Sequence, residues 1–199
     1  MVKQVTKSPV QKDIEAILEE INNAVLGYAM MVVMDDRDLG RGPGTVARSI
    51  NIRSIDDKYL KDFAVKVKKQ GLHNRSAEYA IVVGVKPSYI VSSSLQPLKG
   101  GVYDNHVQWT NEGKQDDAKM ILYNGNHRRA YMREHSNVVE PYMQYKKGLA
   151  EKHTETDPDK QFILESTISK ARKEVEEHGT WLVKFIDSGK YNICGRPHI

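Results

Sequence analysis

Three potential cations stand where the first turn of a helix is expected. The stretch KMILYNGNHRRAYMREH, residues 119–135, has the pattern of a strand that breaks at Asn-Gly-Asn and continues as a helix. His127, Arg128 and Arg129 then fall in the first helical turn. Because a helix N-terminus carries roughly half a positive charge, each cation there costs up to about 1 kcal/mol, whereas acidic side chains stabilise it. Stability of the helix therefore does not explain this placement.

A bound phosphate would explain it. The first four N–H groups of a helix have no partner within the helix. Gly125 lets the backbone approach a guest closely, and we expect Asn126 to cap the first turn. Backbone donors, helix dipole and guanidinium groups would then all act on one anion. The alternative that stays open is an ordinary exposed first turn, whose arginines reach Glu134 or solvent.

Other catalytic and metal-binding patterns are weak. No glycine is followed by Lys-Ser or Lys-Thr at the spacing of a Walker A loop. The histidines are scattered without metal-ligand spacing, and Cys194 is the single cysteine, so we expect no zinc site and no metal held by the protein. The acidic residues that could hold Mg²⁺ or act as a base include Asp56, Asp57, Glu78 and Asp104. Asp35, Asp36 and Asp38 also cluster at the end of an expected strand, where metal-binding carboxylates are often found, although polar loops have the same pattern. The sequence leaves the catalytic residues unassigned.

The elements that must position the turn are marked by apolar periodicity and by caps. The expected helices are one from Ser8 to Gly27, one from Asp56 to Gly71, Val138–Lys152, and one from Asp157-Pro158 to Gly179. The expected strands are 28–34, 46–55 and 80–86, with TWLVKFI and YNIC forming a β-hairpin around a turn at 187–189. Residues 92–118 are polar and predict a long loop or insertion.

The segment ILYNGNHRRAYMRE resembles the phosphate-binding box of the ParB/sulfiredoxin superfamily. In that family a strand leads into a Gly-x-His-Arg or Gly-x-x-Arg turn that opens a helix. The matching residues here are Gly125, Asn126, His127 and Arg128. Sulfiredoxins carry their catalytic cysteine just before the His-Arg pair. Since this chain has Asn126 at that place, the resemblance does not imply sulfinic-acid reductase activity.

An earlier segment carries the resemblance further. ARSINIRSIDDKYLKDFAVKVKKQGL is similar to the family's region in which an Arg-bearing strand end precedes a helix that closes with Gln-Gly-Leu. Arg53 would occupy the strand end, and Gln70-Gly71-Leu72 the close. The resemblance covers roughly residues 46–135, under half of the chain. No helix-turn-helix follows it, in contrast to chromosome-partitioning ParB proteins.

The resemblance implies an α+β fold with a small mixed β-sheet and flanking helices. We divide the chain into 1–44, an N-terminal helix, strand and Gly-rich loop, 45–137, the ParB/sulfiredoxin-like core, and 138–199, the C-terminal helices and β-hairpin. We expect these three ranges to pack as one domain. With 199 residues, the chain is long enough for one domain with a substantial core.

The function that the resemblance implies is binding of nucleoside triphosphate (NTP) phosphates by the Gly125–Arg128 turn, with Arg53 and Arg129 as supporting contacts. NTP hydrolysis or phosphotransfer with Mg²⁺ would be possible reactions, but the sequence does not assign one. The alternative is a DNA- or RNA-binding module or a ParB-like nuclease. A third is a scaffold that has kept the fold and lost the ligand.

Composition is compatible with either partner. The net charge is +4 and the sequence pI is about 9.0, mildly basic as for many proteins that bind nucleotides or nucleic acids. No run of 18 apolar residues exists, so we expect no membrane span. Acidic residues interrupt the apolar positions near the N-terminus, which is unlike a signal peptide. We therefore expect an intracellular protein, cytoplasmic or nuclear.

Overall fold

The computed structural model describes residues 19, 22–33, 43–47, 55–98, 103–115 and 117–190. Arg53 and the segment YNIC, the second strand of the predicted hairpin, lie outside these residues. Of the helix predicted to begin at Ser8, residues 19 and 22–24 are described and are helical. That helix was expected to continue to Gly27, but the chain has already entered a strand at Val25.

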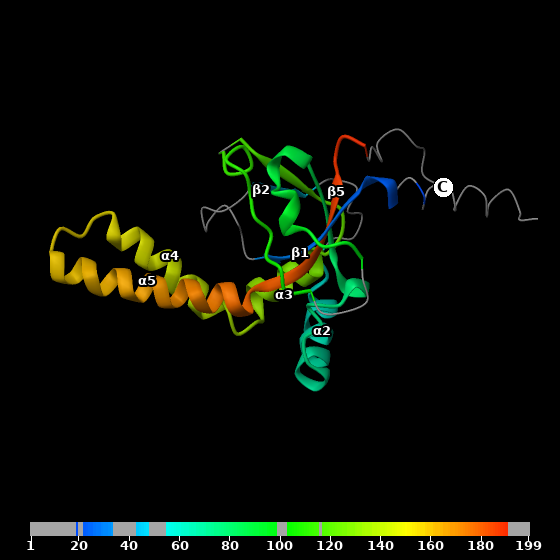
Figure 1. Ribbon diagram of the computed structural model, residues 1–199. Helices are drawn as coiled ribbons and strands as arrows, with labels where there is room; N and C mark the ends of the chain where they lie inside the picture. Colours follow the sequence, from blue (N-terminus) through cyan, green and yellow to red (C-terminus); the bar gives the residue numbers. More distant parts are fainter. Residues whose placement is uncertain are drawn as a thin grey trace, which may run out of the picture.

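The described strands form one mixed sheet in the order β1-β5-β3-β4-β2 (Figure 1). The strands are β1 Val25–Val32, β2 Gly44–Ala47, β3 Ile81–Val85, β4 Lys119–Leu122 and β5 Thr180–Asp187. Strands β1 and β5 pair antiparallel, as do β3 and β4, whereas β5 pairs with β3 and β4 with β2 in parallel. The predicted α+β fold with a small mixed sheet and flanking helices is confirmed.

Four helices accompany the sheet in the described part of the chain, together with short 3₁₀ segments. They are α2 Asp57–Gln70, α3 Asn126–Glu134, α4 Val139–Lys152 and α5 Pro158–His178. Helices α2 and α3 contact each other beside the sheet. Helices α4 and α5 form a hairpin that projects away from it (Figure 1). The predicted starts of α2 and α5 are confirmed, because Asp56 and Asp157 cap them with their side chains.

Strand β5 is an interior strand of the sheet, between β1 and β3. Its side chains Trp181, Leu182, Val183 and Phe185 are buried, as expected for a strand with neighbours on both sides and core on both faces. Strand β1 pairs with one edge of β5, and β3 pairs with the other. Strands from all three predicted ranges of the chain therefore share one sheet, as packing into one domain requires.

The long segment between β3 and β4 is largely irregular in its described parts, as predicted. It follows the outer edge of β1: Tyr28 and Gln96 exchange two backbone hydrogen bonds of 2.8 Å, and Met30 accepts one from Val107. Unpaired strand edges invite unwanted pairing, and a covering loop prevents it. The segment has a structural role at the end of the sheet away from β4.

Candidate functional site

The predicted turn after β4 is fastened to the neighbouring strand β3. The backbone N–H groups of Tyr123 and Asn124 donate to the Val82 carbonyl at 2.9 and 3.3 Å. In return, the Asn124 side-chain oxygen accepts from the Val82 N–H at 2.8 Å. Gly125 follows with φ of +98°, and a Cβ there would lie 2.8 Å from Cγ1 of Ile81. Glycine is therefore required both by backbone conformation and by the lack of space.

Helix α3 begins one residue earlier than an Asn126 cap would require. The N-cap is Gly125, in the left-handed region, and Asn126 is the first helical residue, so the expectation that Asn126 caps the helix is wrong. Gly125 has no side chain with which to cap, and no acidic residue lies in the first turn. Among the described residues, no side chain caps the N–H groups of this turn. Within the part of the chain that the structure describes, these donors are therefore open to a guest or to water.

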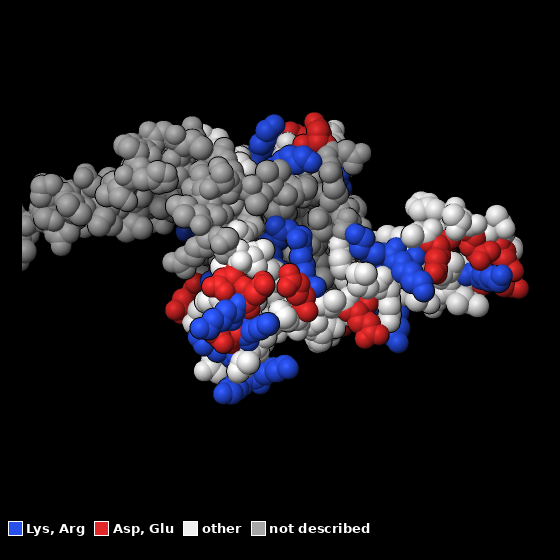
Figure 2. Space-filling view, turned by 180° about the vertical axis from the view of Figure 1, so that it is seen from behind, with Lys and Arg blue, Asp and Glu red and all other residues white. Residues whose placement is uncertain are grey.

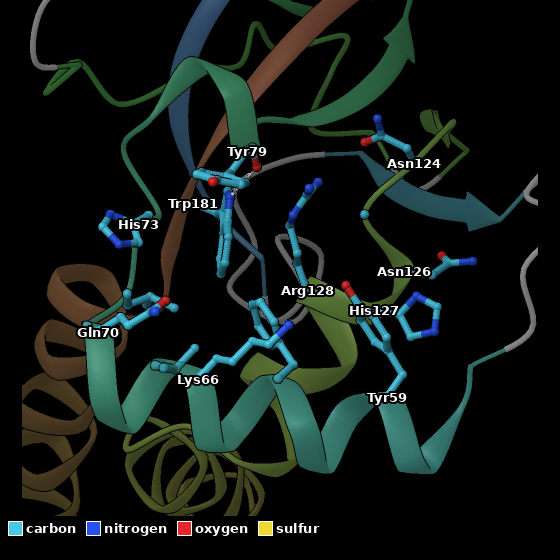
Figure 3. A pocket seen from close by; sticks show the side chains of 15 residues that line it. Tyr59, Lys66, Gln70, His73, Tyr79, Asn124, Asn126, His127, Arg128 and Trp181 are labelled. Carbon is cyan, nitrogen blue, oxygen red and sulfur yellow. Dashed lines mark hydrogen bonds between the residues drawn. The ribbon is translucent and has the colours of Figure 1, made fainter.

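Arg128 extends from α3 into a pocket (Figure 3). Its Nη1 atom lies 3.4 Å from the Ala80 carbonyl oxygen, a long and weak hydrogen bond. Burial lowers the pKa of Arg128, and the neighbouring Tyr59 and Tyr79 act in the opposite direction. The residues that line the pocket include no Asp or Glu. Its guanidinium group is therefore partly desolvated without a carboxylate beside it.

His127 joins the starts of two helices. Its Nε2 atom accepts a hydrogen bond of 3.3 Å from the backbone N–H of Asp56, the N-cap of α2. In the neutral ring the proton is then on Nδ1, which is free to donate. The ring also lies against Tyr59, with 4.6 Å between the ring centroids. This contact fixes the Gly125–Arg128 turn relative to α2.

Arg129 does not share the position of Arg128. Its Nε atom donates to the Val33 carbonyl at 3.4 Å, beyond the end of β1, and Arg129 does not line the pocket. Successive helical residues differ in direction by about 100°, and this step turns Arg129 toward the end of β1 and away from the pocket. The structure therefore gives no support to the predicted contact of Arg129 with a phosphate. Arg53, the other predicted supporting residue, lies outside the described residues.

The pocket has a volume of about 730 Å³, within the ordinary range of ligand sites. It runs along one face of α2, from Tyr59 to Gln70, a length of about 16 Å at 1.5 Å per residue. The other residues that line it are Phe63, Lys66, Val67, Gly71, Leu72, His73, Tyr79, Asn124, Gly125, Asn126, His127, Arg128 and Trp181. Four of the predicted site residues, those of the Gly125–Arg128 turn, thus come together in one cavity.

Several residues of the pocket were not predicted as site residues. Tyr59 lies on the face of α2 that also carries Phe63 and Val67, and it is 51% exposed at the pocket. Lys66 and Gln70 follow it at seven and eleven residues, on the same helix face. Polar residues on an otherwise apolar face were the available signal. Tyr79 and Trp181 carry no such signal in the sequence, because they come from segments far from α2 and α3.

Trp181 forms the floor of the pocket rather than an open surface. It is 2% exposed, and its indole Nε1–H donates to the Tyr79 carbonyl at 2.8 Å. This hydrogen bond holds the 3₁₀ helix Ala77–Tyr79 (η1) against β5. The side chain of Tyr79 itself remains 41% exposed. Through this hydrogen bond, Trp181 positions the aromatic ring of Tyr79 at the rim of the pocket.

The described residues offer no ready-made metal site: nowhere among them do three His, Cys, Asp or Glu side chains gather as ligands. The Asp56 carboxylate is used to cap α2, and Asp104 forms an ion pair with Arg75. Because carboxylates are the protein ligands that Mg²⁺ prefers, the pocket does not fit an Mg²⁺ ion held by the protein itself. No described helix is long and apolar enough to cross a membrane.

Comparison of the chain with family models, with curated proteins and with solved structures finds no match. The resemblance to the ParB/sulfiredoxin superfamily thus remains a prediction carried by the Gly-x-His-Arg turn and the order of elements around it. What the site does must be argued from its own geometry.

Proposed function

We propose that this chain binds a nucleotide, with the phosphate groups held by the Gly125–Arg128 turn. The observation that carries the proposal is the environment of Arg128, a partly buried guanidinium in a pocket lined by no carboxylate. Burying a charge is costly unless it is paired. A phosphate supplies the pairing, and guanidinium groups hold phosphate through two parallel hydrogen bonds.

The helix start adds donors to the same anion. The uncapped N–H groups of the first turn of α3 and its positive pole act on a phosphate together with Arg128. The Nδ1–H of His127 is a further donor at this end. Lys66, across the pocket on α2, adds a positive charge. Several donors of this kind suit a chain of phosphates better than a single one.

The proposal covers binding and leaves the reaction open. Positioning and electrostatic stabilisation supply most of the catalysis in phosphoryl transfer, and this pocket offers both. A nucleoside triphosphate commonly carries Mg²⁺ on its own phosphates, so the ion would arrive with the ligand. Hydrolysis or phosphotransfer would also need a residue to orient the nucleophile, and the geometry singles out none.

A nucleotide fits the charge distribution better than a nucleic acid does. Nucleic-acid binding depends on cations spread along a surface. Figure 2 shows Lys and Arg interspersed with Asp and Glu on the described part of one face. Arg128, by contrast, lies inside a pocket whose lining includes no Asp or Glu. The alternative of DNA or RNA binding therefore ranks second, and a steep fall of affinity with salt would favour it.

Titration calorimetry with ATP, CTP and GTP in the presence of Mg²⁺ tests the proposal. We expect Arg128→Ala to weaken binding roughly tenfold to hundredfold, as for the loss of charged hydrogen bonds. Arg133→Ala is the matched control, because Arg133 is an exposed residue of the same helix outside the pocket. Absence of binding at millimolar nucleotide, or equal affinities of the two variants, would refute the proposal.

A further inference from the structure

The pocket is longer than a phosphate site needs to be. The phosphate turn lies at one end, where the His127 ring contacts Tyr59 in the first turn of α2. The pocket then continues along α2 for about 16 Å and ends at Gln70 and His73 (Figure 3). A single phosphate would leave this second end empty. Its chemistry therefore indicates what the rest of the ligand is.

The second end offers hydrogen-bond acceptors. It lies at the C-terminus of α2, where a helix has unsatisfied carbonyl groups. The Gly71 N–H bonds the Val67 carbonyl. Among the described residues, no backbone N–H donates to the carbonyl oxygens of Lys68, Lys69 or Gln70. The charges of Lys68 and Lys69 offset the negative pole of the helix, so it is through these carbonyl acceptors that this end favours a group with N–H donors.

Flat aromatic surfaces stand beside these carbonyls. The rings of His73 and Tyr79 lie 6.1 Å apart with 37° between their planes, and both side chains are exposed. Exposed aromatic rings of this kind bind nucleobases by stacking. The side-chain amide of Gln70, which carries both donors and an acceptor, lines the same end. Stacking surface and hydrogen-bonding groups together match a planar base with polar edges.

We infer that the end of the pocket formed by Gln70, His73 and Tyr79 binds the base of the nucleotide. This end of the pocket prefers a base with an exocyclic amino group, because that group can donate hydrogen bonds to the C-terminal carbonyls of α2. This inference rests on the proposed function and narrows it to amino-bearing nucleotides, those of adenine, cytosine and guanine. Helix α2 then serves the ligand along its whole length, since its start fixes the phosphate turn and its end reads the base.

Matched nucleotide pairs test this inference on the unaltered protein. ATP and ITP differ at the exocyclic amino group, which a carbonyl replaces in ITP, and CTP and UTP differ in the same way. Inorganic tripolyphosphate serves as a probe for the phosphate end alone. We expect ATP to bind about five- to tenfold more tightly than ITP, and CTP likewise over UTP. We expect both ATP and CTP to bind roughly tenfold to hundredfold more tightly than tripolyphosphate.

A variant separates the two ends of the pocket. His73→Ala should weaken ATP binding about tenfold and leave tripolyphosphate binding unchanged, because the exposed His73 ring lies at the Gln70 end of the pocket and is not among the groups that act on Arg128. If ITP equals ATP, UTP equals CTP and tripolyphosphate still binds, the base assignment is wrong and the phosphate site stands. If tripolyphosphate and all nucleotides fail to bind, both proposals are wrong. A single-stranded oligonucleotide that outcompetes every mononucleotide would overturn the inference in favour of nucleic-acid binding.

Discussion

Helices α2 and α3 lie side by side and place their charges by opposite rules. Helix α2 starts with the Asp56 cap, has Asp57 in its first turn and carries Lys68 and Lys69 in its last turn, as the helix dipole favours. Helix α3 starts with a glycine that cannot cap, and it has no acidic residue in its first turn. The difference shows that the start of α3 is not optimised for the stability of the helix.

Among the four helices α2 to α5, α3 alone has no acidic residue in its first turn, since α4, whose N-cap Val138 also lacks a capping side chain, has Glu140 there. Helix α5 starts like α2, with Asp157 as the N-cap, a proline in the first turn and Asp159 beside it. The His127 contact brings the two kinds of helix start together, since Asp56 donates its backbone N–H to that ring at 3.3 Å. One start carries a side-chain cap, and its neighbour has none among the described residues.

The largest effect is expected for Gly125→Ala. An alanine with φ of +98° is strained by about 1–3 kcal/mol, and its Cβ would also lie 2.8 Å from Ile81 Cγ1. Ile81 is fully buried and cannot move away easily. We expect the free energy of unfolding in urea to fall by about 2–4 kcal/mol, the sum of strain and overpacking. Nucleotide binding should be lost, because the turn must rearrange.

Gly71→Ala is the matched control at the other end of the comparison. Gly71 also has positive φ, +82°, but an added Cβ would meet no atom within 4 Å. The conformational strain of about 1–2 kcal/mol then acts alone. Equal losses for the two variants would show that the Ile81 contact contributes nothing, and that the space at the phosphate turn is not restricted as the structure indicates.

The second effect concerns the cap of α2. Asp56→Ala removes the acceptor for the N–H groups of Lys58 and Tyr59, and a lost cap costs about 1 kcal/mol. Asp157→Ala removes the equivalent cap of α5. We expect both variants to lose similar stability in thermal unfolding, whereas Asp56→Ala alone weakens nucleotide binding, since it loosens the partner of His127. If Asp56→Ala and Asp157→Ala changed nucleotide binding equally, the start of α2 would have no special role in positioning His127.

A smaller effect with two signs is expected for Asn126→Asp. A carboxylate in the first turn of α3 interacts favourably with the helix dipole, by about 0.3–1 kcal/mol. The free protein should therefore gain stability, visible as a higher melting temperature. The same negative charge repels a phosphate, so nucleotide affinity should fall. Asn126→Gln, which adds no charge, controls for the change of side chain. A gain in both stability and affinity would show that no anion binds at this turn.

The sequence predicts α2 and α5 well because their signals are local. A cap residue, a proline or an acidic first turn and a closing glycine lie within each segment. The place of β5 is different. TWLVKFI predicts a strand, but only its pairing with β1 and β3 makes it an interior strand of the sheet, and those partners lie far away in the sequence. Pairings between distant segments leave no local pattern.

The same division holds for the candidate site. The Gly125–Arg128 turn is contiguous, so its residue types alone indicate an anion. The choice between Arg128 and Arg129 depends on how α3 is rotated against the sheet, and residue type does not fix that rotation. The second end of the pocket requires Tyr79 and Trp181 to meet, 102 residues apart. Their hydrogen bond is a product of the fold.

The smallest effect tests the contact between the two helices. Tyr131 of α3 meets Phe63 of α2 edge to face, with 5.1 Å between ring centroids. Burial raises the pKa of Tyr131 above its ordinary value, so the folded state favours the protonated hydroxyl. This contribution is fully present below pH about 10, which is the pKa of tyrosine in an unfolded chain, and it is lost as the pH rises through the folded pKa.

Tyr131→Phe lacks this contribution. As the pH rises from about 9 to about 11, we therefore expect the free energy of unfolding in urea to fall less for Tyr131→Phe than for the unaltered protein. Tyr28, whose pKa burial also raises, is present in both proteins and accounts for the alkaline loss they share. Identical losses would show that the Tyr131 hydroxyl is solvated, and that α3 packs less closely against α2 than the edge-to-face contact implies.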